Sequence, residues 1–294
     1  MDPPFMKITT TLLLILFLFG SFSMPEPWTP LLDKNLSQWD NYLSYRHRTG
    51  YTGKIPTDEN GKELTPIGYN KDKFGVFSVL EEDGDLILRV SGEIYGCVFT
   101  REAFENYHFT LKVKWGDKKY EPRMDKLKDS GILYHSVGEA GVDYWRSWML
   151  SQEFQIMEGH MGDYWPQATS GVDIRAYLPE GIMNSVASQH QSFLPFGAGG
   201  PNNFCLRSEN VESAAGEWTT LELICFEGNS LHIVNGKVVM VLRNSRYLVD
   251  GKTVPLTKGK IQLQSEAAET FFKDIRIKQI RALPEQYKDL FSGR

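Results

Sequence analysis

The segment Ser151–Glu158 holds the side chains of this sequence that are best suited to acid–base chemistry. Successive side chains of a β-strand point to opposite faces, so Glu153 and Gln155 would share one face. Phe154 and Ile156 would then face a core. A carboxyl and an amide flanked by core residues predict the polar floor of a cleft, where Glu153 could transfer a proton. Alternatively, Glu153 is solvated on an outer face or paired with a lysine.

His135 is a second candidate for proton transfer, because an imidazole changes its charge near neutral pH. It closes the segment Asp129–His135, where a strand would place it on the same face as Leu133 and Gly131. A single histidine in a strand is also commonly structural, so both interpretations stay open. Glu153 and His135 are the predicted catalytic residues.

Aromatic and amide side chains around these two residues predict a carbohydrate-binding surface. Sugars stack their apolar faces on flat aromatic rings, and a few polar groups then fix their orientation. Gln264 and Glu266 are two residues apart on another predicted strand and would share a face. The predicted substrate-binding residues are Gln155, Glu158, Trp145, Trp148, Gln264 and Glu266. The tryptophans could alternatively cap only the edge of the fold.

Alternating patterns predict β-strands along most of the chain. From Phe109 to Trp115, apolar residues alternate with threonine and lysine, which is typical of a strand with one buried and one wet face. Further runs rich in β-forming residues occupy 74–80, 86–90, 221–225, 229–241, 261–264 and 271–280. Short strands separated by regular turn signals, without a long amphipathic helix, predict an all-β sandwich or jelly roll.

Composition and charge argue against several classes of function. The 294 residues are 41% hydrophobic with a net charge of −5, which favours a folded domain and disfavours nucleic acid or an anionic membrane as partner. The basic run from Lys112 to Lys128 is interrupted by acidic residues and is interpreted as a solvated surface. Neither a metal-binding motif nor a phosphate-binding glycine loop is present, so no metal and no cofactor are predicted, while a metal held by distant residues such as His135 and Glu153 stays open.

The N-terminus predicts export. Lys7 precedes the unbroken apolar run Leu12–Phe19, and small residues at Ser21 and Ser23 suit a signal peptidase, so residues 1–23 are predicted to be a signal peptide. The run is too short to span a bilayer, and no membrane span is predicted elsewhere. We expect a secreted or periplasmic protein with one domain at 25–284 and a polar C-terminal tail at 285–294.

An ordered set of segments resembles the 3-keto-disaccharide hydrolase domain family, long catalogued as a domain of unknown function. The segments are Trp28–Trp39, Tyr107–Trp115, Asp129–His135, Gln152–Ile156, Gly216–Thr220, His232–Lys237, Gly259–Gln264 and Phe272–Ile277. The resemblance implies a concanavalin A-like jelly-roll β-sandwich of two antiparallel sheets whose concave face binds a small-molecule or oligosaccharide substrate. The departures from the family pattern are an insert at 42–73 and an insertion at 137–149, both of which could reshape the pocket.

The chemistry that this resemblance implies begins with a sugar oxidised to a ketone at C3, which acidifies the hydrogen at C2. Removal of that proton expels the group on C1, and water then adds to the enone. Such a site needs a base near C2 and donors to the developing C3 oxyanion. Glu153 or His135 would be the base, and Gln155 or Gln264 would be donors, together with whichever of Glu153 and His135 is not the base.

Two alternatives from other classes stay open. The segment Glu153–Glu158 is similar to the Glu-x-Asp-x-x-Glu strand of retaining β-glucanases, in which two carboxylates act as nucleophile and acid/base. Gln155 stands here in place of the aspartate, and Glu158 would face away from Glu153 unless the strand is bulged. The second alternative is a non-catalytic sugar-binding module that uses the same face and aromatic residues.

Overall fold

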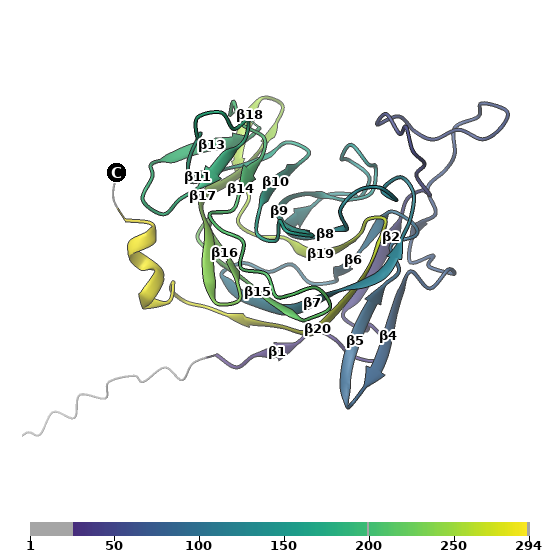
Figure 1. Ribbon diagram of the computed structural model, residues 1–294, viewed down its shortest axis with the longest axis horizontal. Coiled ribbons are helices and arrows are strands. Elements are labelled where there is room, and N and C mark those ends of the chain that lie inside the picture. The colour runs from purple at the N-terminus through teal and green to yellow at the C-terminus, as the bar shows by residue number, and fades with distance from the viewer. Residues whose placement is uncertain (1–25, 199, 293–294) are drawn as a thin grey trace, which may run out of the picture.

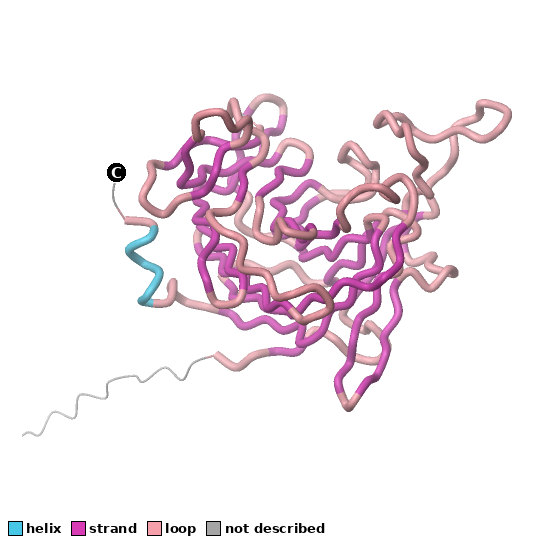
Figure 2. Tube along the Cα trace, viewed as in Figure 1, coloured by secondary structure: helices cyan, strands magenta, loops and turns pink. Residues whose placement is uncertain are grey.

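The computed structural model describes residues 26–198 and 200–292, which form twenty β-strands and one short 3₁₀-helix. The predicted signal peptide at 1–23 lies outside these residues. Figure 1 shows the strands wrapped into two layers, and Figure 2 shows how little of the described chain is helical. No helix among the described residues is long and apolar enough to cross a membrane.

One layer, here called the outer sheet, is antiparallel throughout. In spatial order its strands are β4 (Phe77–Glu82), β5 (Asp85–Val90), β20 (Ala268–Gln279), β7 (Tyr107–Lys119), β15 (Thr219–Phe226), β16 (Asn229–Val234), β17 (Lys237–Val249), β11 (Ser170–Tyr177) and β13 (Phe193–Gly197). Two short strands extend it, β1 (Thr29–Pro30) against β20 and β18 (Lys252–Pro255) against β17.

The other layer, here called the inner sheet, is antiparallel apart from one short pair. Its strands are β3 (Gly68–Tyr69), β2 (Trp39–Leu43), β6 (Gly96–Thr100), β19 (Lys260–Ser265), β8 (Asp129–Val137), β9 (Leu150–Met157), β10 (Tyr164–Gln167), β14 (Cys205–Leu206) and β12 (Ser185–Ala187). β12 and β14 are parallel, and β11 joins the two sheets by pairing with both β12 and β17. The predicted all-β jelly-roll sandwich is confirmed.

Alternation along the strands builds the core between the two sheets. Phe109 and Leu111 of β7 face it from the outer sheet, and Ile132 of β8 and Phe154 of β9 face it from the inner sheet. All four are fully buried, and they belong to one large cluster of apolar side chains. Because neighbouring positions on each strand point the other way, residues such as Glu153 are directed to the opposite face of the inner sheet.

The C-terminal residues are packed onto the outer sheet. Glu285–Leu290 form the 3₁₀-helix η1, and Tyr287, Leu290 and Phe291 pack against a buried apolar cluster on the exterior of this sheet. Arg175 of β11 donates hydrogen bonds to the backbone oxygens of Leu290 (2.8 Å) and Ser292 (3.0 Å). The part of the predicted polar tail that the structure describes is therefore docked on the sandwich.

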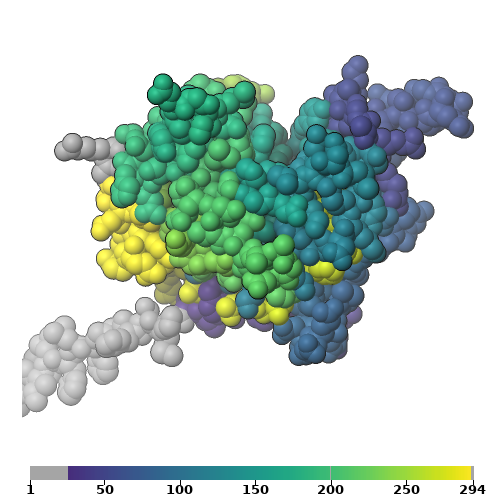
Figure 3. Space-filling model, viewed as in Figure 1, coloured from purple at the N-terminus to yellow at the C-terminus, as the bar shows by residue number. Residues whose placement is uncertain are grey.

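The predicted insert at 42–73 leaves the inner sheet after β2 and returns at β3. Its middle part projects from the body of the protein as the purple and blue excursion at the upper right of Figures 1 and 3. Between its ends it contributes Tyr51 and Gly53 to contacts with the loop that precedes β9. The insert thus reaches the same face of the inner sheet as Glu153.

Candidate active site

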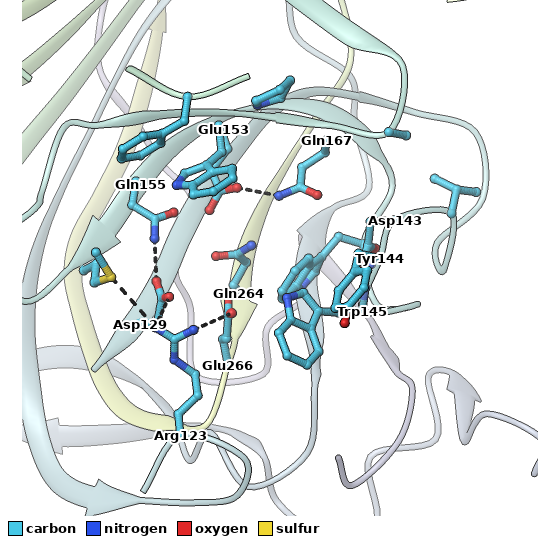
Figure 4. A pocket seen from close by; sticks show the side chains of 17 residues that line it. Arg123, Asp129, Asp143, Tyr144, Trp145, Glu153, Gln155, Gln167, Gln264 and Glu266 are labelled. Carbon is cyan, nitrogen blue, oxygen red and sulfur yellow. Dashed lines mark hydrogen bonds and ion pairs between the residues drawn. The ribbon is translucent and has the colours of Figure 1, made fainter. Parts of the chain in front are cut away.

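A pocket of about 620 Å³ lies on the face of the inner sheet that points away from the core. Strands β8, β9, β10 and β19 supply its floor, and the loops before β8 and β9 supply its sides. The charged and amide side chains of the floor are Arg123, Asp129, Glu153, Gln155, Gln264 and Glu266, and the aromatic lining is Tyr144, Trp145, Trp148, Trp165 and Phe204. Figure 4 shows the polar groups facing one another, with Tyr144 and Trp145 to one side.

The centre of the floor depends on a glycine. Gly131 of β8 lies opposite Gln155 of β9, and β8 is also paired with β19 on its other side. A Cβ atom at Gly131 would lie within 2.5 Å of Glu153 Oε1 and closer still to Gln264 Oε1. The absent side chain therefore lets Glu153 and Gln264 reach over β8 from the two neighbouring strands and meet above it.

Glu153 is a carboxyl held in a dry environment. It is 2% exposed, and its Oε2 atom accepts a hydrogen bond of 2.5 Å from Nε2 of Gln167 on β10. Burial raises the pKa of Glu153 to about 8, with further increases from Asp129 and Asp143, against the opposing effect of the Gln167 hydrogen bond. A carboxyl that titrates near neutral pH can both accept and donate a proton under physiological conditions.

Arg123 and Asp129 form the charged corner of the pocket. Nη2 of Arg123 lies 2.6 Å from Oδ2 of Asp129, and Gln155 donates a hydrogen bond of 2.6 Å to Oδ1 of Asp129. Burial raises the pKa of Asp129 to about 7, while Arg123 and the backbone N–H of Ser130 favour its charged form. Gln155 is thus committed to holding Asp129, although it also lines the pocket.

Glu266 follows the last residue of β19 and is 6% exposed. Its nearest cation is again Arg123, whose Nη1 atom lies 3.7 Å from Oε1 of Glu266. Burial first, and then the neighbouring Asp129, raise the pKa of Glu266 well above its ordinary value. One guanidinium therefore serves two carboxyls, and it is much closer to Asp129.

Gln264 lies between Glu153 and Glu266 and is 1% exposed. Its amide is close enough to Glu153 to lower the pKa of that carboxyl. Neither Oε1 nor Nε2 of Gln264, however, forms a hydrogen bond of normal geometry with any described residue. A buried amide without partners is costly in a folded protein, and such a group directed into a pocket is suited to binding a ligand.

Trp145 and Trp148 both line the pocket, and Asp143 fixes the loop that carries them. The Asp143 carboxylate accepts hydrogen bonds from the backbone N–H groups of Trp145 (2.6 Å) and Trp148 (2.5 Å). Trp148 is 1% exposed, and its indole N–H donates to the Gly96 oxygen at 2.8 Å, so it forms part of the packed wall. Trp145 is only half-buried and offers more of its ring to a ligand.

The insert supports this aromatic wall from behind. Tyr51 is stacked on Trp145, with ring centroids 5.0 Å apart and an interplanar angle of 17°. The Tyr51 hydroxyl donates a hydrogen bond to the backbone oxygen of Tyr144 (3.0 Å), and the Tyr144 hydroxyl donates one to the backbone oxygen of Tyr51 (3.2 Å). His47 is also in ring contact with both Tyr51 and Trp145. The predicted insert thus shapes one side of the pocket.

His135 does not take the place that its sequence position predicted. The β8–β9 register shifts after Tyr134, and His135 has a positive φ of 53°, which turns its side chain away from the face of Gly131. The ring lies against Tyr134 and Tyr107 in the core, is 1% exposed and does not line the pocket. Burial lowers the pKa of His135 to about 4, which corresponds to a neutral core histidine.

Glu158 also lies apart from the pocket. β9 ends at Met157, which lines the pocket, and no register shift occurs between β8 and β9 at this end. Glu158 instead accepts a hydrogen bond of 3.2 Å from the Lys128 backbone N–H and lies 3.6 Å from the Lys128 ammonium group. The bulged pair of carboxylates that a β-glucanase-like strand requires is therefore not formed by Glu153 and Glu158.

Four polar residues that line the pocket are not among the predicted site residues. Asp129 lies in a segment of the family resemblance, Arg123 in the basic run interpreted as solvated surface and Asp143 in the insertion at 137–149, whereas no sequence pattern marks Gln167. Arg123 and Asp129 are brought together by the fold of the loop before β8, which periodicity does not reveal. Among the described residues, no group of three histidine, cysteine, aspartate or glutamate side chains is arranged to hold a metal ion.

Comparisons with known structures find other β-proteins at low sequence identity. A protein from Parabacteroides distasonis, provisionally assigned as a glycosyl hydrolase, is 18% identical over 86% of this chain and 100% of its own, with a TM-score of 0.45. Another such protein from that organism is 14% identical over 83% and 89%, with a TM-score of 0.43. SCLam, an endo-β-1,3(4)-glucanase of family GH16, is 12% identical over 88% and 94%, with a TM-score of 0.41.

No match to this sequence was found among curated protein sequences. A family profile does match, and it describes a 3-keto-α-glucoside-1,2-lyase-like domain over residues 27–278. The match spans both sheets and every residue of the pocket floor described above. The resemblance inferred from the ordered segments is thereby confirmed, and the chain belongs to the 3-keto-α-glucoside-1,2-lyase-like domain family.

Proposed function

We propose that this protein cleaves the glycosidic bond of 3-keto-glycosides, with Glu153 as the base that removes the proton from C2. The observation that carries the proposal is the meeting of Glu153 and Gln264 above Gly131 at the bottom of an aromatic-walled pocket. One group accepts a proton near neutral pH, and the other is a buried amide that forms no hydrogen bond of normal geometry with a described residue. These are the two functions that proton abstraction beside a ketone requires.

In the proposed reaction, Glu153 takes the C2 proton and the electron pair moves to the C3 oxygen, giving an enolate. The amide N–H of Gln264 donates a hydrogen bond to that oxygen. When the C3 carbonyl re-forms, a double bond forms between C1 and C2, the C1–O bond breaks, and the leaving oxygen takes up a proton from solvent. A water molecule then adds to C1 and loses a proton to solvent, and Glu153 returns its proton to C2, which completes a net hydrolysis.

The aromatic wall supports a sugar ring as the ligand in this pocket. Trp145 is fixed from behind by Tyr51, so its ring is already oriented before a substrate arrives. Trp165 of β10 also belongs to the aromatic lining. It is 41% exposed and in ring contact with Phe204. Flat exposed rings around a polar floor are suited to the apolar faces and hydroxyl groups of a pyranose.

The second candidate is a sugar-binding module without catalysis, since the same wall would serve binding alone. The unfavourable burial of three carboxyl groups in the pocket floor favours an enzyme over a binding module. Asp129, Glu153 and Glu266 are each at most 6% exposed, and within the described part of the chain Arg123 is the only guanidinium paired with any of them. The binding of neutral hydroxyl groups does not require several buried carboxyl groups, whereas proton transfer requires such groups with altered pKa values.

The test is to incubate the purified protein with a 3-keto-glucoside that carries a chromogenic leaving group, and in parallel with the unoxidised glucoside and laminarin. We expect release from the keto sugar alone, and a Glu153→Gln variant with an unchanged circular dichroism spectrum should release far less. Release from the unoxidised glucoside or from laminarin would favour an ordinary glycosidase. Binding without release from any substrate would favour the sugar-binding module.

Export is a further part of the proposal, and it rests on the apolar run Leu12–Phe19. When the full chain is produced in a bacterium with a periplasm, we expect the recovered protein to begin at Met24, after removal of residues 1–23. Mass spectrometry of the intact protein measures this directly. Recovery of the uncleaved chain from the cytoplasm would contradict export.

A further inference from the structure

The pocket floor holds more negative charge than its surroundings can stabilise. Asp129, Glu153 and Glu266 are three carboxyls around one guanidinium, so full ionisation would leave two uncompensated negative charges in a buried site. Burying an unpaired charge is so unfavourable that one or more of such groups normally takes up a proton instead. The positions of the neighbouring donors indicate which carboxyls carry the protons.

Asp129 receives nearly all of the stabilisation available for a negative charge. Arg123 lies 2.6 Å away on one oxygen, and the Gln155 amide donates to the other at 2.6 Å. Glu266 has only the more distant end of Arg123, at 3.7 Å, and no described residue donates a hydrogen bond to it. Because donors favour the carboxylate form, the charge resides on Asp129 and the proton on Glu266.

Glu266 and Gln264 are placed to act together. They are two residues apart at the end of β19, and both side chains extend into the pocket on the same side, as Figure 4 shows. Each lies close to β8, where Glu266 forms an isolated bridge with Asp129. A neutral carboxylic acid has an O–H group that can donate a hydrogen bond, which a carboxylate cannot do.

We propose that Glu266 enters the reaction as a neutral carboxylic acid whose O–H group, beside the Nε2 amide of Gln264, donates a hydrogen bond to the C3 oxygen of the substrate as negative charge develops on it. This inference rests on the proposed function for its substrate. No covalent bond to Glu266 forms or breaks, and its proton stays on the carboxyl group. Glu153 alone exchanges a proton with C2.

The groups around Glu266 agree with this assignment. Burial raises the pKa of Glu266 well above its ordinary value, and the nearby carboxyls Asp129, Glu153 and Asp143 raise it further, while Arg123 lowers it. Tyr95, from the segment before β6, is a further titratable group that interacts electrostatically with Glu266. These neighbours therefore favour the acid form of Glu266, and its ionisation at alkaline pH would remove the donor.

The kinetic test compares Glu266→Gln with Glu266→Ala on the 3-keto-glucoside. Glutamine keeps a neutral hydrogen-bond donor of the same shape, so we expect kcat within about threefold of the native enzyme, whereas alanine should lower kcat by about 10²–10³, as is usual when one oxyanion donor is lost. The loss of activity that the native enzyme shows at alkaline pH should move to higher pH in Glu266→Gln. Equal losses in both variants would overturn the proposal, because they would mean that the carboxylate itself is needed.

A readout independent of activity keeps the two proposals apart. In the infrared, a protonated carboxyl absorbs at a different frequency from a carboxylate. Because Glu153 also holds a proton near neutral pH, the test uses the native minus Glu266→Gln difference spectrum at pH 7, which should show a protonated-carboxyl band, and the same difference should persist when both proteins also carry Glu153→Gln. Absence of such a band from Glu266 would overturn this inference even if the enzyme cleaves keto sugars. A native protein that shows the band but cleaves no keto sugar would instead refute the proposed function.

Discussion

Two groups of charged residues, one in the pocket floor and one in the turn between β9 and β10, differ in how completely their carboxyls are satisfied. In the turn between these strands, Asp163 is fully buried and both of its oxygens have partners. Oδ1 accepts from the backbone N–H of Arg207 (2.7 Å) and from its guanidinium (3.1 Å), and Oδ2 lies 3.0 Å from His160. Glu212 nearby accepts two backbone N–H groups, from Gly159 and Met161.

The pocket floor shows the opposite arrangement. Glu153 has one donor, Glu266 has only a guanidinium at 3.7 Å, and Gln264 has no hydrogen-bond partner among the described residues. Fully satisfied polar groups hold a fold in one conformation, whereas unsatisfied ones raise its free energy unless they have another use. The turn that contains Asp163 therefore stabilises the fold, whereas the unsatisfied groups of the pocket floor are suited to binding a ligand.

The largest expected effect that separates the two groups is on catalysis. Glu153→Gln should lower kcat/KM on a 3-keto-glucoside by about 10²–10⁴, the usual contribution of a general base, because glutamine cannot accept the C2 proton. Glu212→Gln removes a carboxylate from the structural group and should leave the kinetics unchanged. Steady-state rates of both variants measure the difference, and retention of activity by Glu153→Gln would eliminate Glu153 as the base.

The next largest expected effect is on the free energy of unfolding, and it concerns the group around Asp163. Asp163→Ala leaves the Arg207 guanidinium and His160 without their carboxylate, and breaking a buried ion pair costs about 3–5 kcal/mol of unfolding free energy. Asp85→Ala, which removes an exposed ion pair with Lys273, should change the unfolding free energy far less. Urea denaturation measures the unfolding free energy of both variants. Equal losses would show that Asp163 does not stabilise the fold more than a surface ion pair does.

The strand floor was largely predictable from the sequence, because alternation decides which side chains share a face. Glu153 with Gln155, and Gln264 with Glu266, were identified in this way, and all four line the pocket. The large apolar residues between them fixed the opposite face as the core. The same rule failed for His135, because a register shift and a positive φ interrupt β8 at that point.

Contacts between distant segments were beyond the reach of pattern analysis. Arg123 stands in a lysine-rich run that has the composition of solvated surface, and only the folded loop brings its guanidinium to Asp129 and Glu266. The sequence around Gly131 gives no sign that the side chains of two neighbouring strands pass over this residue. Such features depend on sheet order, which the sequence pattern leaves open.

The third effect is on stability and depends on pH. Burial raises the pKa of Glu153 to about 8 from an ordinary value of 4.5, so the folded state binds more protons than the unfolded state between these pH values and stability falls as pH rises through them. Each pKa unit corresponds to about 1.4 kcal/mol. Glu153→Gln should therefore be more stable than the native protein at pH 8, with a difference that disappears towards pH 4. Thermal unfolding across this range measures it, and a constant difference would contradict the raised pKa.

The smallest expected effect concerns the wall that the insert supports. Tyr51→Ala removes the ring stacked on Trp145, and aromatic pairs of this kind contribute about 0.5–1.5 kcal/mol beyond the burial of their surface. Because Tyr51 lies behind the wall and not against the substrate, its loss should loosen Trp145 and raise KM by about two- to tenfold while kcat stays nearly unchanged. Tyr177→Ala is the matched control, since Tyr177 is an exposed tyrosine of β11 outside the pocket. An unchanged KM in Tyr51→Ala would mean that the insert does not determine how the pocket holds its sugar, and that the loop fastened by Asp143 is sufficient to orient Trp145.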